Sequence, residues 1–107
     1  MNSEMSREEY LAVSTLTAAV TTFLRTGAAP MLLPVFLLVA RWPDRTTAEL
    51  ARQEKTSLAT MGRHLLTLGH INLGLVKTET DVGDSRYIRH SLTDKGIALL
   101  RRMVTRR

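Results

Sequence analysis

Small polar side chains and one arginine recur at helical spacing between residues 56 and 68. If this segment is a helix capped by Ser57, its apolar side carries Leu58, Met61, Leu65 and Leu68. The opposite side carries Thr56, Ala59, Thr60, Arg63 and Thr67. Threonine and arginine can hydrogen-bond to base edges or phosphates, and small side chains permit close approach. The pattern predicts a helix lying in a nucleic-acid groove; the alternative is an ordinary amphipathic surface helix.

A second charged group lies around a predicted hairpin tip, at Asp81, Asp84, Arg86 and Arg89. The flanking segments 75–80 (LVKTET) and 87–92 (YIRHSL) have strand character, with Ile88, His90 and Leu92 alternating with their neighbours. Thr93 can cap a closing helix whose apolar stripe we expect at Ile97, Leu100 and Val104. The predicted hairpin tip therefore presents an arginine next to acidic residues. The alternative interpretation is a charge-rich turn whose residues serve only the backbone geometry.

The three histidines do not suggest a metal site. His64, His70 and His90 are scattered along the sequence, and His64 lies beside the polar stripe, where it is a candidate phosphate contact. No nucleophile–base pair, glycine-rich phosphate loop or carboxylate pair stands out. We therefore predict neither an enzyme, nor a cofactor, nor a bound metal.

Helical segments precede the polar stripe. Residues 6–27 form one predicted helix, with Ser6 and Glu9 as a capping box and an apolar stripe at Val13, Leu16, Val20 and Leu24. Helices follow at about 30–41, at 46–54 with Thr46 or Thr47 as the cap, and at 58–69. The order is α-α-α-α-β-β-α, mainly α with a small β-hairpin. Two short helices followed by a hairpin predict a winged helix-turn-helix.

Length, cysteine content and net charge limit the classes of protein to which this chain can belong. The 107 residues suffice for one domain, and the absence of cysteine excludes disulfides and zinc–thiolate sites and fits a reducing cytoplasm. The net charge is +5, all of it in residues 53–107, because residues 1–52 are balanced. This asymmetry suggests a polyanion-binding half, although a solvated basic surface is the alternative.

One apolar run could be mistaken for a membrane segment. Residues 28–40 (AAPMLLPVFLLVA) are uncharged and apolar but contain two prolines, and a bilayer span needs roughly 20 such residues. A helix apolar on nearly every side needs cover, some of which a second chain could supply. We expect a single domain over residues 1–107, with dimerisation through 1–41 and 94–107, and no membrane association.

Several short motifs resemble the MarR family of bacterial transcription regulators. Asp84–Ser85–Arg86, a strand, then Leu92–Thr93 and Gly96 resemble the family's wing signature. The segments ELA at 49–51, TMGR at 60–63 and GLVKTE at 74–79 resemble its helix-turn-helix and wing entry. The resemblance covers about residues 32–100. The chain is short beside the family's usual long C-terminal dimerisation helices.

The resemblance implies a homodimeric, sequence-specific double-stranded DNA-binding repressor in a bacterial cytoplasm. The recognition helix, about 57–69, would enter the major groove, and the wing, about 77–92, the minor groove. Arg86 would read a narrow minor groove with Asp84 holding it in place, and Arg89 would lie nearby. Family members often bind aromatic acids, so a small aromatic ligand is a further expected partner.

Two other functions compete with this interpretation. The winged helix could dock another protein through its apolar helices, as an adaptor or antagonist. It could also be a DNA-binding accessory protein of a plasmid or phage, for which the small size is suitable.

Overall fold

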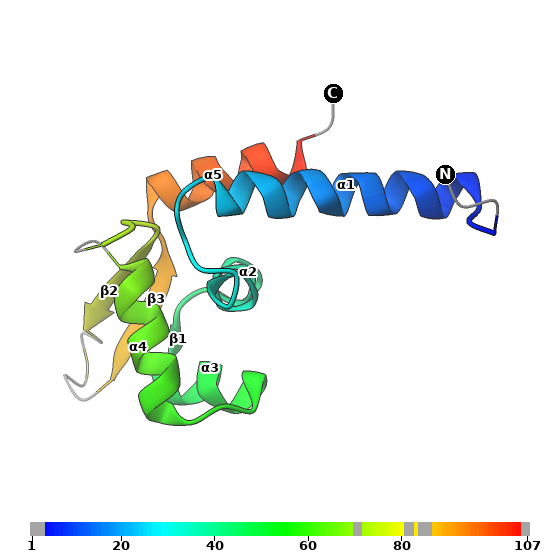
Figure 1. Cartoon of the computed structure of the whole chain (residues 1–107). Coiled ribbons are helices and arrows are strands. Elements are labelled where there is room, and N and C mark those ends of the chain that lie inside the picture. Colours follow the sequence, from blue (N-terminus) through cyan, green and yellow to red (C-terminus); the bar gives the residue numbers. More distant parts are fainter. Residues whose placement is uncertain (1–3, 70–71, 81–82, 84–86, 106–107) are drawn as a thin grey trace.

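The computed structural model describes residues 4–69, 72–80, 83 and 87–105, which form five helices and three strands (Figure 1). The elements are α1 (Arg7–Leu24), α2 (Leu32–Arg41), β1 (Arg45–Thr46), α3 (Thr47–Glu54), α4 (Leu58–Leu68), β2 (Val76–Thr80), β3 (Ile88–Leu92) and α5 (Asp94–Val104). The mainly helical winged helix-turn-helix expected from the sequence is confirmed. Every predicted helix is present, and β1 is the one additional element in the described residues.

The three strands form one antiparallel sheet in the order β1-β3-β2. β2 and β3 pair from Val76 opposite Leu92 to Thr80 opposite Ile88. β1 adds two residues on the other side of β3, with Arg45 opposite His90. A two-residue strand has no alternation to detect, which is why the sequence did not reveal β1. The pairing of β1 with β3 connects the start of α3 directly to the strands of the hairpin.

Side-chain caps fix where four of the helices begin. Ser6 and Glu9 form a capping box at α1, and Thr46 and Glu49 form another at α3. Ser57 accepts a hydrogen bond from the backbone N–H of Thr60, and Thr93 accepts one from that of Gly96. These caps satisfy backbone donors that the first helical turn leaves free. The sequence predicted each of them, and Thr46 rather than Thr47 caps α3.

The core lies where α2 meets the helix-turn-helix and the sheet. Phe36 and Val39 of α2 are fully buried, as are Leu50 of α3 and Met61 and Leu68 of α4. α2 contributes the buried side chains Leu32, Val35, Phe36, Leu38 and Val39. The apolar run at 28–40 therefore contributes to the core of the single chain, whereas the sequence alone left open a core or a second chain as its cover. Within the described residues, every helix is too short or too polar to span a bilayer.

Parts of two predicted apolar stripes face solvent instead of the core. In α5 the buried residues are Gly96, Leu99 and Met103, while Ile97 is 37% and Val104 59% exposed. In α4 the stripe is correct at Met61, Leu65 and Leu68, but Leu58 is 59% exposed. The prediction for α5 was wrong at Ile97 and Val104, while Leu100 is partly buried against the core. This helix carries two apolar stripes, and only packing against α1 and the sheet selects between them.

α1 and α5 lie side by side and run in opposite directions, with α5 covering only the C-terminal half of α1 (Figure 1). The N-terminal half of α1 stands clear of the remaining structure, and the principal dimensions are 55 × 26 × 22 Å. Phe23 is the one buried residue of α1, packing on Phe36 with ring centroids 5.4 Å apart. The stripe at Val13, Leu16, Val20 and Leu24 is exposed in the single chain.

Candidate nucleic-acid interface

The outward face of α4 is set by what α4 buries. Met61, Leu65 and Leu68 lie in the core, and the 3.6-residue helical repeat then turns the opposite side to solvent. Ser57, Ala59, Arg63 and Thr67 are exposed on that side, and Thr56 and Thr60 are partly exposed. We call these six residues the α4 face. The structure thus brings together the stripe that the sequence predicted, with short side chains around one arginine.

Hydrogen bonds order part of the α4 face. The hydroxyl of Ser57 donates to Oγ1 of Thr60 at 2.9 Å, and Nη2 of Arg63 donates to the same oxygen at 3.3 Å. Ser57 Oγ in turn accepts from the backbone N–H of Thr60 at 3.0 Å. One turn further along, the hydroxyl of Thr67 donates to the backbone oxygen of Arg63 at 3.0 Å. The arginine is therefore held along the helix toward its N-terminus.

His64, a candidate phosphate contact, is only partly exposed. Its Nδ1 atom is buried, and in the described part of the chain it has no hydrogen-bond partner. Among the described residues, no hydrogen bond orients this ring nitrogen.

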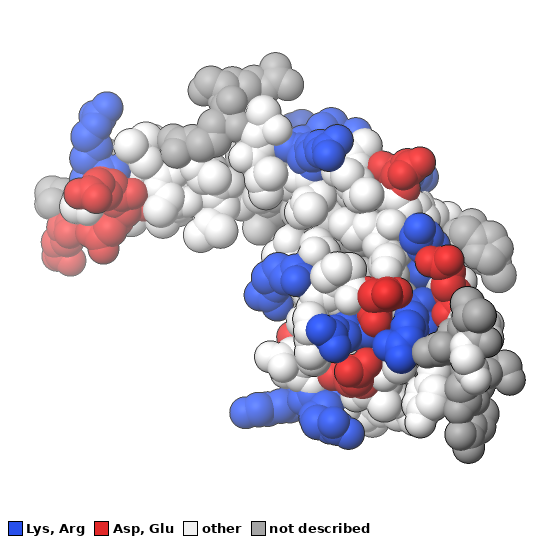
Figure 2. Space-filling view, turned by 180° about the vertical axis from the view of Figure 1, so that it is seen from behind, with Lys and Arg blue, Asp and Glu red and all other residues white. Residues whose placement is uncertain are grey.

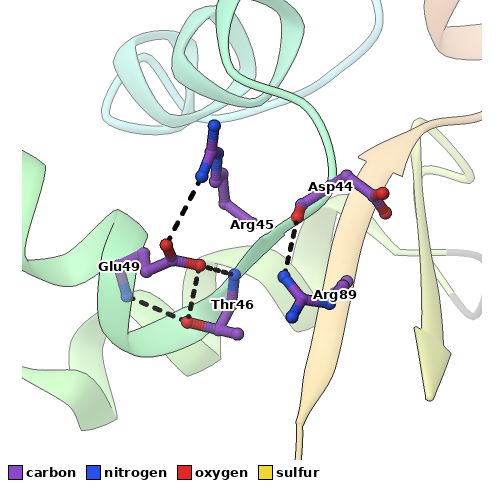
Figure 3. Close-up of polar contacts among 5 residues, drawn as sticks. All are labelled: Asp44, Arg45, Thr46, Glu49 and Arg89. Carbon is purple, nitrogen blue, oxygen red and sulfur yellow. Dashed lines mark hydrogen bonds and ion pairs between the residues drawn. The ribbon is translucent and has the colours of Figure 1, made fainter. Parts of the chain in front are cut away.

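Arg89 is engaged with the sheet rather than extended from it. Its Nη1 atom donates to the backbone oxygen of Asp44 at 3.2 Å (Figure 3). Glu79 faces it across the β2–β3 pair. Asp84 and Arg86, the other two candidates of the wing, lie outside the described residues, and so does His70.

A cluster that the sequence did not single out joins α2, β1 and α3. The guanidinium of Arg45 lies over the ring of Trp42, 4.4 Å from its centroid, and 3.6 Å from Oε2 of Glu49. Glu49 also accepts from the backbone N–H of Thr46 at 2.9 Å (Figure 3). That hydrogen bond is the main reason why the pKa of Glu49 lies below its usual value. The cluster anchors the first turn of α3, and its sequence signal was the tryptophan close to an arginine in RWPDRT.

His90 is the buried polar residue at the centre of the sheet, 5% exposed. Its Nε2 atom is 2.8 Å from Oγ1 of Thr47, and its Nδ1 atom is 3.1 Å from Oγ1 of Thr78. Burial lowers the pKa of this imidazole, so the neutral ring is favoured. The sequence predicted the inward position of His90 but not its two threonine partners.

Charge is unevenly distributed over the molecule. Figure 2 shows a tip of α1 with acidic and basic residues, then an uncharged length of α1, then both signs mingled over the winged-helix part. Residues 10–24 of α1 contain no charged side chain. Among the described residues, no group of three or more histidine or carboxylate side chains is placed to hold a metal ion.

Solved structures with the same arrangement of elements are transcription regulators. A MarR transcriptional regulator from Methanosarcina mazei Go1 superposes with a TM-score of 0.69 at 23% identity, over 88% of this chain and 66% of that one. The transcriptional regulator Tm0710 from Thermotoga maritima gives 0.75 at 14% identity, over 89% and 66%.

The chain has the winged-helix fold of the MarR family. A MarR family transcription regulator, SP03579, superposes with a TM-score of 0.68 at 20% identity over 87% of this chain. The chain spans 60% of the length of that regulator. No protein-family model and no curated protein sequence matches the chain. In this winged helix-turn-helix, α3 and α4 are the two consecutive short helices, and β2 and β3 are the arms of the hairpin that forms the wing.

Proposed function

We propose that this chain is a transcription regulator that binds double-stranded DNA sequence-specifically, as a homodimer, and represses. The observation that carries the proposal is the α4 face. It combines Arg63 with short hydroxyl and methyl side chains on a helix whose other side is fixed in the core. Such a helix can approach base edges closely, and its buried side prevents it from rotating about its own axis. The fold shared with MarR family transcription regulators supports the same function.

In this proposal the α4 face enters the major groove and the wing approaches the adjacent minor groove. Arg86 is proposed to enter that groove, attracted by the negative potential of narrow A·T-rich segments. Asp84 is proposed to orient Arg86. Arg89, whose Nη1 atom donates to the backbone oxygen of Asp44, lies opposite Glu79 toward the tip end of the β2–β3 pair, where it can add positive charge near a phosphate.

The homodimer is proposed to form through α1 and α5. The N-terminal half of α1 packs against no other element of the described chain, although it carries apolar side chains. Val13 is 47% and Leu16 is 64% exposed there. A hollow of about 710 Å³ also runs between α1 and the end of α5, with Arg25, Arg102 and Met103 in its wall. An uncharged, partly apolar helix that projects from its own domain is marginal alone and is stabilised by packing on a second copy.

A small aromatic ligand remains a prediction. A hollow of about 320 Å³ between α4 and the sheet has a size suited to one. Its wall combines apolar Leu65 and Val76 with the polar Thr78 and His90.

The proposal is tested by selecting bound duplexes from a random pool and titrating the selected duplex against salt. We expect a recurrent, two-fold symmetric sequence, and an affinity that falls steeply as salt rises. Arg63→Ala should weaken the selected duplex by roughly 1–3 kcal/mol and random duplex by less. Arg7→Ala is the matched control, because Arg7 is an exposed arginine at the first turn of α1, far from α4.

The outcomes separate the competing functions. If Arg63→Ala and Arg7→Ala have the same small effect, α4 does not read the groove. If no duplex is bound at any salt, the adaptor or antagonist function replaces DNA binding. A non-symmetric or sequence-independent preference would favour a plasmid or phage accessory protein.

A further inference from the structure

The hydrogen bonds within the α4 face restrict what each side chain can offer a base. Oγ1 of Thr60 accepts from Ser57 Oγ at 2.9 Å and from Arg63 Nη2 at 3.3 Å. A hydroxyl oxygen has two lone pairs, and both are used here. The proton of Thr60 is then left to donate outward. Arginine has donors and no acceptor. Thr60 and Arg63 together therefore present donors alone.

Thr67 has the opposite polarity. Its hydroxyl proton is used on the backbone oxygen of Arg63 at 3.0 Å, so its free lone pairs accept. Within one helix the face changes from donors at Thr60 and Arg63 to an acceptor at Thr67. The change follows from which neighbour each hydroxyl uses, since the two threonines are chemically identical.

From this polarity, and resting on the proposed DNA binding, we infer that Arg63 reads a guanine through its O6 and N7 atoms and that Thr60 is the residue that positions it. In the major groove, guanine alone offers two acceptors side by side. Adenine places an amino donor beside its N7, and cytosine presents an amino donor, so both leave donors facing donors. The contact to Thr60 holds the guanidinium in one orientation before binding, which favours a two-pronged contact over a loose phosphate contact.

The test uses the selected duplex with each guanine replaced in turn by 7-deazaguanine, which lacks the N7 acceptor. One position in each half-site should lose affinity by roughly fivefold or more. Inosine at the same position keeps O6 and N7 and should bind as guanine does. In Arg63→Lys, which keeps the charge without the planar fork, random-duplex binding should persist while the sensitivity to 7-deazaguanine disappears.

The role of Thr60 is tested by a pair of substitutions at that residue and one matched control. Thr60→Val removes the hydroxyl at nearly constant shape and should lower the preference for guanine over adenine by several-fold, a larger loss than its effect on random-duplex affinity. Thr60→Ser should restore the preference. Thr67→Val removes the same group from the same face without touching the Arg63 side chain, so its effect on the guanine preference should be smaller than that of Thr60→Val.

Each result decides something different. A selected sequence with no position sensitive to 7-deazaguanine overturns the inference while DNA binding stands. An unchanged guanine preference in Thr60→Val overturns the positioning role. Failure of the wild type to bind any duplex removes the proposed function and this inference with it. If circular dichroism shows that Thr60→Val is unfolded, Thr60→Ser and the 7-deazaguanine series on the wild type decide.

Discussion

Nε2 of His90 lies 2.8 Å from Oγ1 of Thr47, so a buried side chain of β3 is hydrogen-bonded to the first residue of α3. On the other side of the ring, Nδ1 lies 3.1 Å from Oγ1 of Thr78 on β2. One neutral imidazole can donate at one nitrogen and accept at the other, which suits two hydroxyl partners. The ring therefore links the wing to the helix-turn-helix.

We expect acid to destabilise the protein through His90. Burial lowers the folded-state pKa of this ring below the ordinary 6.5, so the unfolded chain binds a proton at a higher pH than the folded one. The free energy of unfolding should be constant above the unfolded-state pKa and should fall as pH drops below it. Urea titrations between pH 7.5 and 5 should show this loss of stability. In His90→Gln the free energy of unfolding should depend less on pH over the same range.

A second acid-sensitive window should lie lower. Hydrogen bonds at the capping boxes lower the pKa of Glu9 and of Glu49 below 4.5, and their contribution is lost only as pH falls below that value. An equal slope for wild type and His90→Gln between pH 7.5 and 5 would assign the first window to another group.

The same substitution should have opposite signs at two helical glycines. A Cβ added to Gly96 would overlap the backbone oxygen of Leu75 and lie 3.3 Å from Cβ of Leu92. Gly96→Ala should therefore cost about 1–3 kcal/mol, because α5 must move away from the strand entry. A Cβ added to Gly62 meets nothing within 4 Å, so Gly62→Ala should add about 0.5–1 kcal/mol through helix propensity. Thermal unfolding of both variants checks the pair, and two changes of the same sign would contradict it.

Lys55, the last residue before the turn of the helix-turn-helix, has a left-handed backbone with φ 55°. Side chains strain this conformation, and glycine does not, although glycine loses more entropy on folding. Lys55→Gly should stabilise the protein by about 0.5 kcal/mol. Arg25→Gly is the control, because Arg25 caps α1 in a right-handed conformation and should gain nothing. Denaturant titrations measure both, and a gain in the control alone would refute the explanation.

Leu16→Glu should dissociate the proposed dimer. Leu16 is 64% exposed in the middle of the uncovered stripe of α1, where a buried carboxylate at a symmetric interface would face its own copy. Sedimentation at micromolar concentration should change from dimer to monomer. Leu66→Glu is the matched control, since Leu66 is 61% exposed on α4 and should leave the dimer intact. A wild type that sediments as a monomer would remove the dimer from the proposal.

Local signals in the sequence determined most of the elements and the polarity of α4. Caps such as Ser57 and Thr93 act within one turn, and the buried stripe of Met61, Leu65 and Leu68 repeats at the helical period. These properties depend only on near neighbours along the chain, so they are readable without the fold. The wing motif around Leu92 and Gly96 predicted how the hairpin joins α5, and the tight contact at Gly96 is the physical reason for a glycine there.

Tertiary structure alone decided which of two equally periodic faces of α5 is buried. Ile97, Leu100 and Val104 repeat as regularly as Gly96, Leu99 and Met103, but only the second set lets α5 approach Leu75 and pack beside α1. It likewise decided that two residues at Arg45 pair with β3, and that Arg89 donates to the backbone of Asp44. Periodicity along a chain indicates that an apolar stripe exists. Which stripe is buried depends on the free energy of packing against segments far away in sequence, and no local pattern contains that quantity.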